Sequence, residues 1–79
     1  MATVNGVVRK VRRLRNTLNG NPRYSVVIET HAGDMFTGVT DHDAMFVYAV
    51  SWGTLQGKVA VIEYKAPRVN NYITGLVII

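Results

Sequence analysis

Five basic side chains crowd into seven consecutive positions near the start of the chain: Arg9, Lys10, Arg12, Arg13 and Arg15. Arg23 follows them, and residues 1–23 contain no acidic side chain. Lys and Arg at this density commonly neutralise phosphate groups, and the affinity that results falls steeply with salt. The cluster therefore predicts a polyanion-binding surface, provided that the fold presents these side chains together on one exposed face.

The distribution of charge leaves two other interpretations of the cluster open. Residues 24–57 carry four acidic side chains and no Lys or Arg, and residues 58–79 return to a charge of +2, within a net charge of +4. The arginines could be solvated or paired with those carboxylates across a sheet, or they could meet a protein partner. An electrostatic field polarised in this way attracts a polyanion to one side of the molecule. It is an argument about binding partners and not about the fold.

Aromatic side chains stand beside cations at two places. Tyr24 follows Arg23, and Tyr64 precedes Lys65. Stacking of a base on an aromatic ring is worth roughly 1–3 kcal/mol, so single-stranded nucleic acid needs such rings as well as charge. We therefore add Tyr24 and Tyr64 to the predicted site. The other aromatic candidates are Phe36, Tyr72 and Trp52. Trp52 and Phe46 are assigned to the core or to the end of the predicted helix.

Other chemistries are poorly supported by the sequence. Residues 41–43 read Asp-His-Asp, but neighbouring residues rarely converge on one ion, and a helix start explains both carboxylates. The chain has no cysteine, which excludes disulfides, thiol nucleophiles and thiolate metal sites. No phosphate-loop pattern or catalytic motif is present. We predict no catalytic residue, no metal ligand and no cofactor, and hence a protein that is not an enzyme.

The first half of the chain reads as three strands. Residues 3–15 favour a strand because valine is a poor helix former, although Val8, Val11 and Arg15 also fall near helical spacing, so an amphipathic helix remains the rival. Residues 16–22 are dense in turn formers. Residues 23–30 alternate as a half-buried strand, and residues 31–33 turn the chain into a strand over 34–39, which predicts an antiparallel hairpin.

The second half begins with a predicted helix. Thr40 is placed to cap it, with carboxylates in its first turn and Gly53 as a left-handed end. Residues 58–65 resume strand alternation, residues 66–71 form a turn, and residues 72–79 make a last apolar strand.

This order of elements predicts the fold class. Three strands, one short helix and two strands match a mainly β, five-stranded OB-like barrel, with the helix between the third and fourth strands. An SH3-like barrel is the alternative. Closure of the sheet is expected, since five short strands in an open sheet would leave unpaired edges and an exposed apolar face. Residues 1–79 are expected to form one domain.

Several turn and cap residues carry a resemblance over most of the chain. These are residues 12–16, residues 20–24, and residues 40–41 with Ala44 before an aromatic segment. In this pattern the chain resembles small uncharacterised proteins of actinobacterial phages. The resemblance implies a phage origin and brings no activity or site residue with it.

The function predicted from these patterns is non-enzymatic binding of nucleic acid, with single strands favoured and low sequence specificity. The alternative is a phage-encoded protein-interaction or assembly module that forms homo-oligomers through β edges, because residues 73–79 are rich in apolar side chains. No membrane partner is expected, since no apolar run approaches the roughly 20 residues that span a bilayer. The absence of cysteine fits the cytoplasm, which is the host cytoplasm for a phage-encoded protein.

Overall fold

Alternating apolar and polar side chains form five β-strands in the computed structural model, which describes residues 2–79. The strands are β1 (Ala2–Leu14), β2 (Arg23–Glu29), β3 (Met35–Thr40), β4 (Val59–Lys65) and β5 (Tyr72–Ile78). Two short 3₁₀ helices, η1 (Met45–Tyr48) and η2 (Trp52–Thr54), lie between β3 and β4. The strand prediction for residues 3–15 is confirmed, and the rival helix is wrong.

The strands close into one barrel in the order β1-β2-β3-β5-β4. The first three strands form an antiparallel meander, and β5 joins β3 in a short parallel pairing, Val39 with Tyr72 and Thr40 with Ile73. The predicted small five-stranded barrel is confirmed, and this order is the OB-like one. No helix of residues 2–79 is long and apolar enough to cross a membrane.

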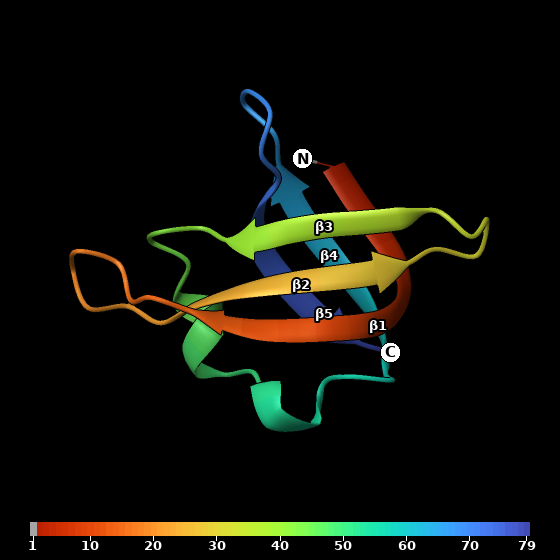
Figure 1. Ribbon diagram of the computed structural model, residues 1–79, viewed down its shortest axis with the longest axis horizontal. Helices are drawn as coiled ribbons and strands as arrows, with labels where there is room; N and C mark the ends of the chain where they lie inside the picture. Colours follow the sequence, from red (N-terminus) through yellow and green to blue (C-terminus); the bar gives the residue numbers. More distant parts are fainter. Residues whose placement is uncertain (1) are drawn as a thin grey trace.

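Strand β1 belongs to both halves of the barrel. Its first part, Ala2 to Val7, pairs with β4, and its second part, Val7 to Leu14, pairs with β2. Figure 1 shows the strand curving between these two partners. A bulge at Arg9 interrupts the ladder with β2, because Val8 is opposite Ile28 while Lys10 is opposite Val27. Bulges bend a strand and strengthen its twist, which suits a strand that must turn a corner.

The core lies inside the barrel. Its fully buried apolar side chains come from β1, β2, β4, β5 and the connection between β3 and β4: Val8, Val26, Ile28, Leu55, Ala60, Ile62 and Ile73. Strand β3 adds Phe36, which packs against this cluster. The alternation predicted for β2 is confirmed, because Val26 and Ile28 point inward and Ser25 and Val27 do not. Leu55, which directly follows η2, is the member of this cluster that comes from the connection between β3 and β4.

The predicted α-helix over residues 40–53 is wrong in type and in its boundaries. Thr40 is the last residue of β3 and is fully buried, and Gly53 does not have the left-handed backbone expected of it. The segment contains β-branched, aromatic and glycine residues, which favour helix weakly. The indole N–H of Trp52 also donates to the carbonyl of Val47, at 2.9 Å, which ties the segment into separate short turns.

The hydroxyl of Thr40 extends the hairpin instead of capping a helix. Its Oγ1 accepts a hydrogen bond from the backbone N–H of Tyr24 at 3.0 Å, just beyond the last β2–β3 pair of the ladder. We expect Thr40→Val to lower the free energy of unfolding by about 1–3 kcal/mol, because the Tyr24 amide would lose its acceptor. Urea denaturation followed by Trp52 fluorescence measures this. Thr40→Ser keeps the hydroxyl and is the control; an equal loss in both variants would contradict the assigned hydrogen bond.

Candidate functional site

The bulge in β1 decides which basic side chains face outward. In a strand without a bulge, Lys10 and Arg12 would share the face of Val8, which is fully buried. The extra residue Arg9 shifts the alternation by one, so that Val8 and Val11 point to the core while Lys10 and Arg12 point to solvent. The same segment thus supplies a core strand and an exposed cationic row.

Lys10, Arg12 and Arg23 form what we term the basic face, on the outside of β1 and β2. Lys10 lies opposite Val27, Arg12 opposite Ser25, and Arg23 opposite Leu14. Among residues 2–79, no carboxylate forms an ion pair with any of these three cations. They are therefore available to an external anion, as the polyanion interpretation requires.

Among residues 2–79, Arg9 is the member of the basic cluster that forms an ion pair with a carboxylate of the protein. Its Nε donates to the Glu29 carboxylate at 2.9 Å. Glu29 is the acidic side chain that would repel phosphates on the outer face of β2, and the ion pair offsets that repulsion. Arg9 thus lowers the cost of bringing an anion close to β2, whether or not it contacts the anion itself.

Tyr72 is an aromatic side chain in register with the basic face that was not included in the site predicted from the sequence. Cross-strand pairing aligns Arg12, Ser25, Val39, Tyr72 and Lys65 in one row over β1, β2, β3, β5 and β4. With strands about 4.8 Å apart, Tyr72 lies roughly 15 Å along the sheet from Arg12. The sequence feature that could have indicated this position is that Tyr72 directly precedes Ile73. Because Ile73 is buried, the alternation of a strand places Tyr72 on the outer face.

Tyr24 and Arg13 lie together at an end of the barrel rather than on the basic face. The Tyr24 ring stacks on Trp52 with centroids 4.1 Å apart and planes inclined by 9°. Arg13 donates to the Tyr24 hydroxyl at 3.0 Å and also hydrogen-bonds Asn16. One ring face of Tyr24 is therefore already covered by Trp52, and Arg13 holds the ring and the following loop in place.

Tyr64 is separated from the predicted arginines. It packs against the core, and its ring lies 4.6 Å from that of Phe36. It points inward because it follows the alternation of the buried Ala60 and Ile62 on β4. The structure thus does not bring Tyr64 to the basic face, and the cation beside it in sequence, Lys65, points to the opposite side.

Arg15 lies beyond β1, in the loop that leads to β2. Together with Arg23 it lines a hollow of about 440 Å³, which we term the loop pocket. The residues around it are mostly polar: Arg15, Asn16, Thr17, Leu18, Asn19, Arg23 and His42. Because Arg23 belongs to both surfaces, the loop pocket continues the basic face.

Lys65 and Asp41 form an ion pair near the pocket, with Nζ and Oδ2 3.0 Å apart. Burial alone would raise the pKa of Asp41, but the hydrogen bonds from Lys65 and from the His42 amide, with the charge of Lys65, hold the pKa below its ordinary value of 3.8. This ionised form stabilises the fold at pH values above the ordinary pKa, and the stabilisation is lost as pH falls through the lowered one. Asp41 is thus already neutralised near the loop pocket.

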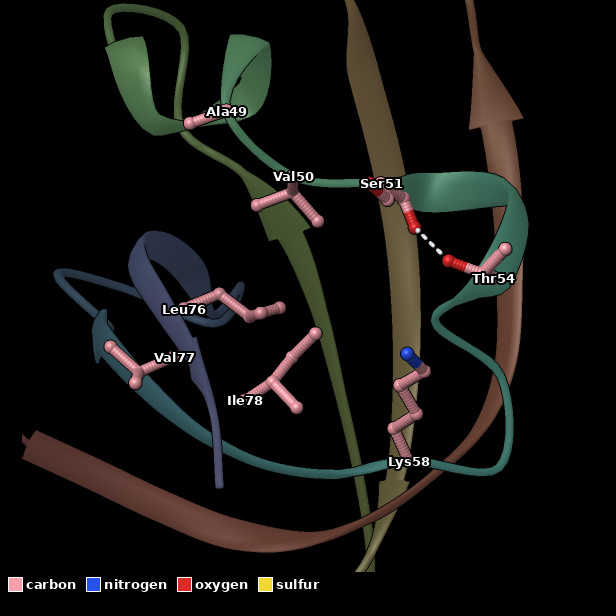
Figure 2. A pocket seen from close by; sticks show the side chains of 8 residues that line it. All are labelled: Ala49, Val50, Ser51, Thr54, Lys58, Leu76, Val77 and Ile78. Atoms are coloured by element: carbon pink, nitrogen blue, oxygen red, sulfur yellow. Dashed lines mark hydrogen bonds between the residues drawn. The ribbon is translucent and has the colours of Figure 1, made fainter.

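A second hollow, of about 380 Å³, has a different character and lies beside β5. Figure 2 shows Leu76 and Ile78 from β5 pointing towards Val50, with Lys58 at its border. Strand β3 pairs with β5 only at Tyr72 and Ile73, so from Gly75 to Ile78 the ladder joins β5 to β4 alone. The hollow follows this edge of β5.

The described residues include no group of three or more His, Asp or Glu side chains arranged to hold a metal ion. The closest arrangement to one is Asp41 with His42, whose Nδ1 lies 3.7 Å from the Asp41 carboxylate that also pairs with Lys65. Comparison of the chain with models of protein families, with curated proteins and with solved structures finds no match. The chemistry of its surfaces is therefore the basis for assigning a function.

Proposed function

We propose that this protein binds single-stranded nucleic acid, with low sequence specificity and without catalysis, through its basic face. The observation that carries the proposal is the outward row of cations without carboxylate partners, Lys10, Arg12 and Arg23. Phosphate contacts of this kind position a strand but carry no sequence information. Tyr72 adds an aromatic surface on the outside of β5, in register with Arg12 through the pairings of β1, β2, β3 and β5, and unpaired bases are the ones that can stack on it.

Binding to labelled oligonucleotides at several salt concentrations tests the proposal. With three or four phosphate contacts, the affinity for a single strand is expected to fall roughly 20- to 50-fold between 50 and 200 mM salt. Fluorescence anisotropy with matched single- and double-stranded DNA and RNA measures the affinity and its salt slope. An absence of binding at low salt rejects the proposal, and a preference for duplex rejects its assignment to single strands. A cytoplasmic location, in the host for a phage protein, belongs to the same proposal.

A second candidate function is assembly through β5. Val77, Ile78 and Ile79 are 64%, 42% and 75% exposed, beside the hollow of Figure 2. We propose a second copy of the chain as the occupant, because antiparallel pairing of two β5 edges about a two-fold axis places like apolar residues against one another. Around the barrel, β5 is two strands from both β1 and β2, so such a dimer keeps the two basic faces apart.

Sedimentation over a range of concentrations distinguishes this second function. A dimer is expected at high concentration, and Val77→Lys should return it to a monomer, because a lysine on an edge strand opposes pairing. Val69→Lys, in the exposed turn between β4 and β5, is the matched control and should leave the dimer intact. A strictly monomeric protein at high concentration removes this candidate.

A further inference from the structure

The loop beside the loop pocket is held in a fixed shape by its own hydrogen bonds. The Thr17 amide donates to the Asn21 carbonyl, and the Gly20 amide donates to the Thr17 carbonyl, both at 2.9 Å. The Asn21 amide in turn donates to the Thr17 hydroxyl at 3.1 Å. Gly20 adopts a φ of 84°, which a glycine accepts without strain. This wall of the pocket therefore needs no ligand to order it.

Asn21 also fastens the loop to the opposite wall of the pocket. Its side-chain amide donates to the His42 carbonyl at 3.1 Å, and its Oδ1 accepts a hydrogen bond from the Tyr48 hydroxyl at 2.7 Å. His42 follows β3, so these bonds join the β1–β2 loop to the β3–β4 connection, which Figure 1 shows on the same side of the barrel. A pocket fixed on two sides binds with a lower ordering cost than a mobile loop.

The charge of the pocket suits an anion. Two guanidinium groups, an imidazole, and amide and hydroxyl groups line it, and no carboxylate does so among the described residues. Asp41, next to His42, is occupied by Lys65 and by the His42 amide. Guanidinium groups bind phosphate oxygens through paired hydrogen bonds, which makes arginine the residue of choice for phosphate recognition.

Arg23 adds an independent observation. Its Nε–H is buried, and among the buried side-chain polar atoms of residues 2–79 it is the one without a hydrogen-bond partner. Buried donors in folded proteins are paired in the large majority of cases, so such an atom calls for a partner. An anion in the loop pocket would supply an acceptor once the Arg23 side chain adjusts towards it.

We propose that the loop pocket binds the terminal phosphate of a nucleic-acid strand in preference to an internal phosphodiester. This inference rests on the proposed function. A terminal phosphomonoester carries a charge near −2 and three acceptor oxygens, whereas a diester carries −1 and must continue in both directions. Arg15, Arg23 and His42 offer enough donors for the former. Leu18, fully exposed on the pocket border, offers apolar surface to the terminal sugar or base.

The test compares three labelled single strands of one sequence, with a 5′-phosphate, with a 3′-phosphate, and with hydroxyl groups at both ends. At least one phosphorylated strand should bind about tenfold more tightly than the hydroxyl strand, as one charged hydrogen-bonded contact provides. Equal affinities for all three overturn the inference and leave the proposed function standing. Failure of all three to bind at low salt rejects the proposed function as well, so the two failures differ.

Two variants test whether the preference for a terminal phosphate arises in the loop pocket. Arg15→Ser should reduce the ratio of affinities to about one, since Arg15 is an exposed side chain of the pocket and its loss should not unfold the barrel. Arg12→Ser, on the basic face outside the pocket, should weaken all three strands and preserve the ratio. A ratio that survives Arg15→Ser, in a protein shown to be folded by circular dichroism, assigns the preference elsewhere and overturns the inference.

Discussion

Replacing Lys10 and Arg12 together by serine is expected to weaken single-strand binding about 25-fold at 0.1 M salt and to lower the salt slope by about 1.4. Counterion release causes this change, since each phosphate contact with a single strand contributes about 0.7 to the slope. Both side chains are exposed, and neither is hydrogen-bonded or ion-paired to another described residue, so the variant should keep its stability. The measurement is anisotropy with a labelled oligonucleotide over a salt series.

Lys58 provides a matched control for this result. It is an exposed lysine like Lys10, but it borders the hollow beside β5 rather than the basic face. Lys10→Ser alone should weaken binding about fivefold, whereas Lys58→Ser should change it by less than about twofold. Equal losses in the two single variants would mean that net charge alone attracts the nucleic acid, and the basic face would not be its site.

The spacing that made the first segment ambiguous has a physical explanation. Val8 and Val11 are three residues apart, which in the sequence suggests either a helix or two different faces of a strand. The bulge at Arg9 provides a third possibility, in which an extra residue returns Val11 to the face of Val8. Apolar residues at helical spacing inside a run of β-branched residues are therefore also the pattern of a bulged strand. The outward position of Lys10 and Arg12 depends on this bulge.

The five strands could be predicted because their alternation is a local property. The helix could not be predicted correctly, because Thr40 serves equally well as a helix cap and as an acceptor for a neighbouring strand, and only the pairing of β2 with β3 decides between these roles. The sequence did not indicate where the tyrosine rings would lie, for a similar reason. Tyr24 and Tyr64 were chosen because a cation is next to each of them in sequence. The face of the strand on which a tyrosine lies depends instead on which neighbouring residue is buried, and the buried Ile73 places Tyr72 on the outer face.

Gly6→Ala is expected to destabilise the protein by more than about 3 kcal/mol, because overpacking at this point involves the backbone and not only side chains. Strand β1 passes from β4 to β2 next to Gly6. A Cβ added there would overlap the Glu29 carbonyl oxygen and approach the Ile28 side chain to 2.9 Å. Relief would require β1 to move away from the strand that it pairs with. For a domain of this size such a loss is a large part of the total stability.

Gly53→Ala tests whether the effect belongs to this crossing rather than to glycine replacement in general. Nothing lies within 4 Å of a Cβ at Gly53, and its φ is not positive, so its substitution should change the free energy of unfolding by less than about 0.5 kcal/mol. Urea denaturation followed by Trp52 fluorescence and circular dichroism compares the two variants. A Gly6→Ala protein as stable as Gly53→Ala would show that β1 does not pass this closely over β2. The register that turns Lys10 and Arg12 outward would then have to be revised, because the bulge and the crossing belong to the same stretch of β1.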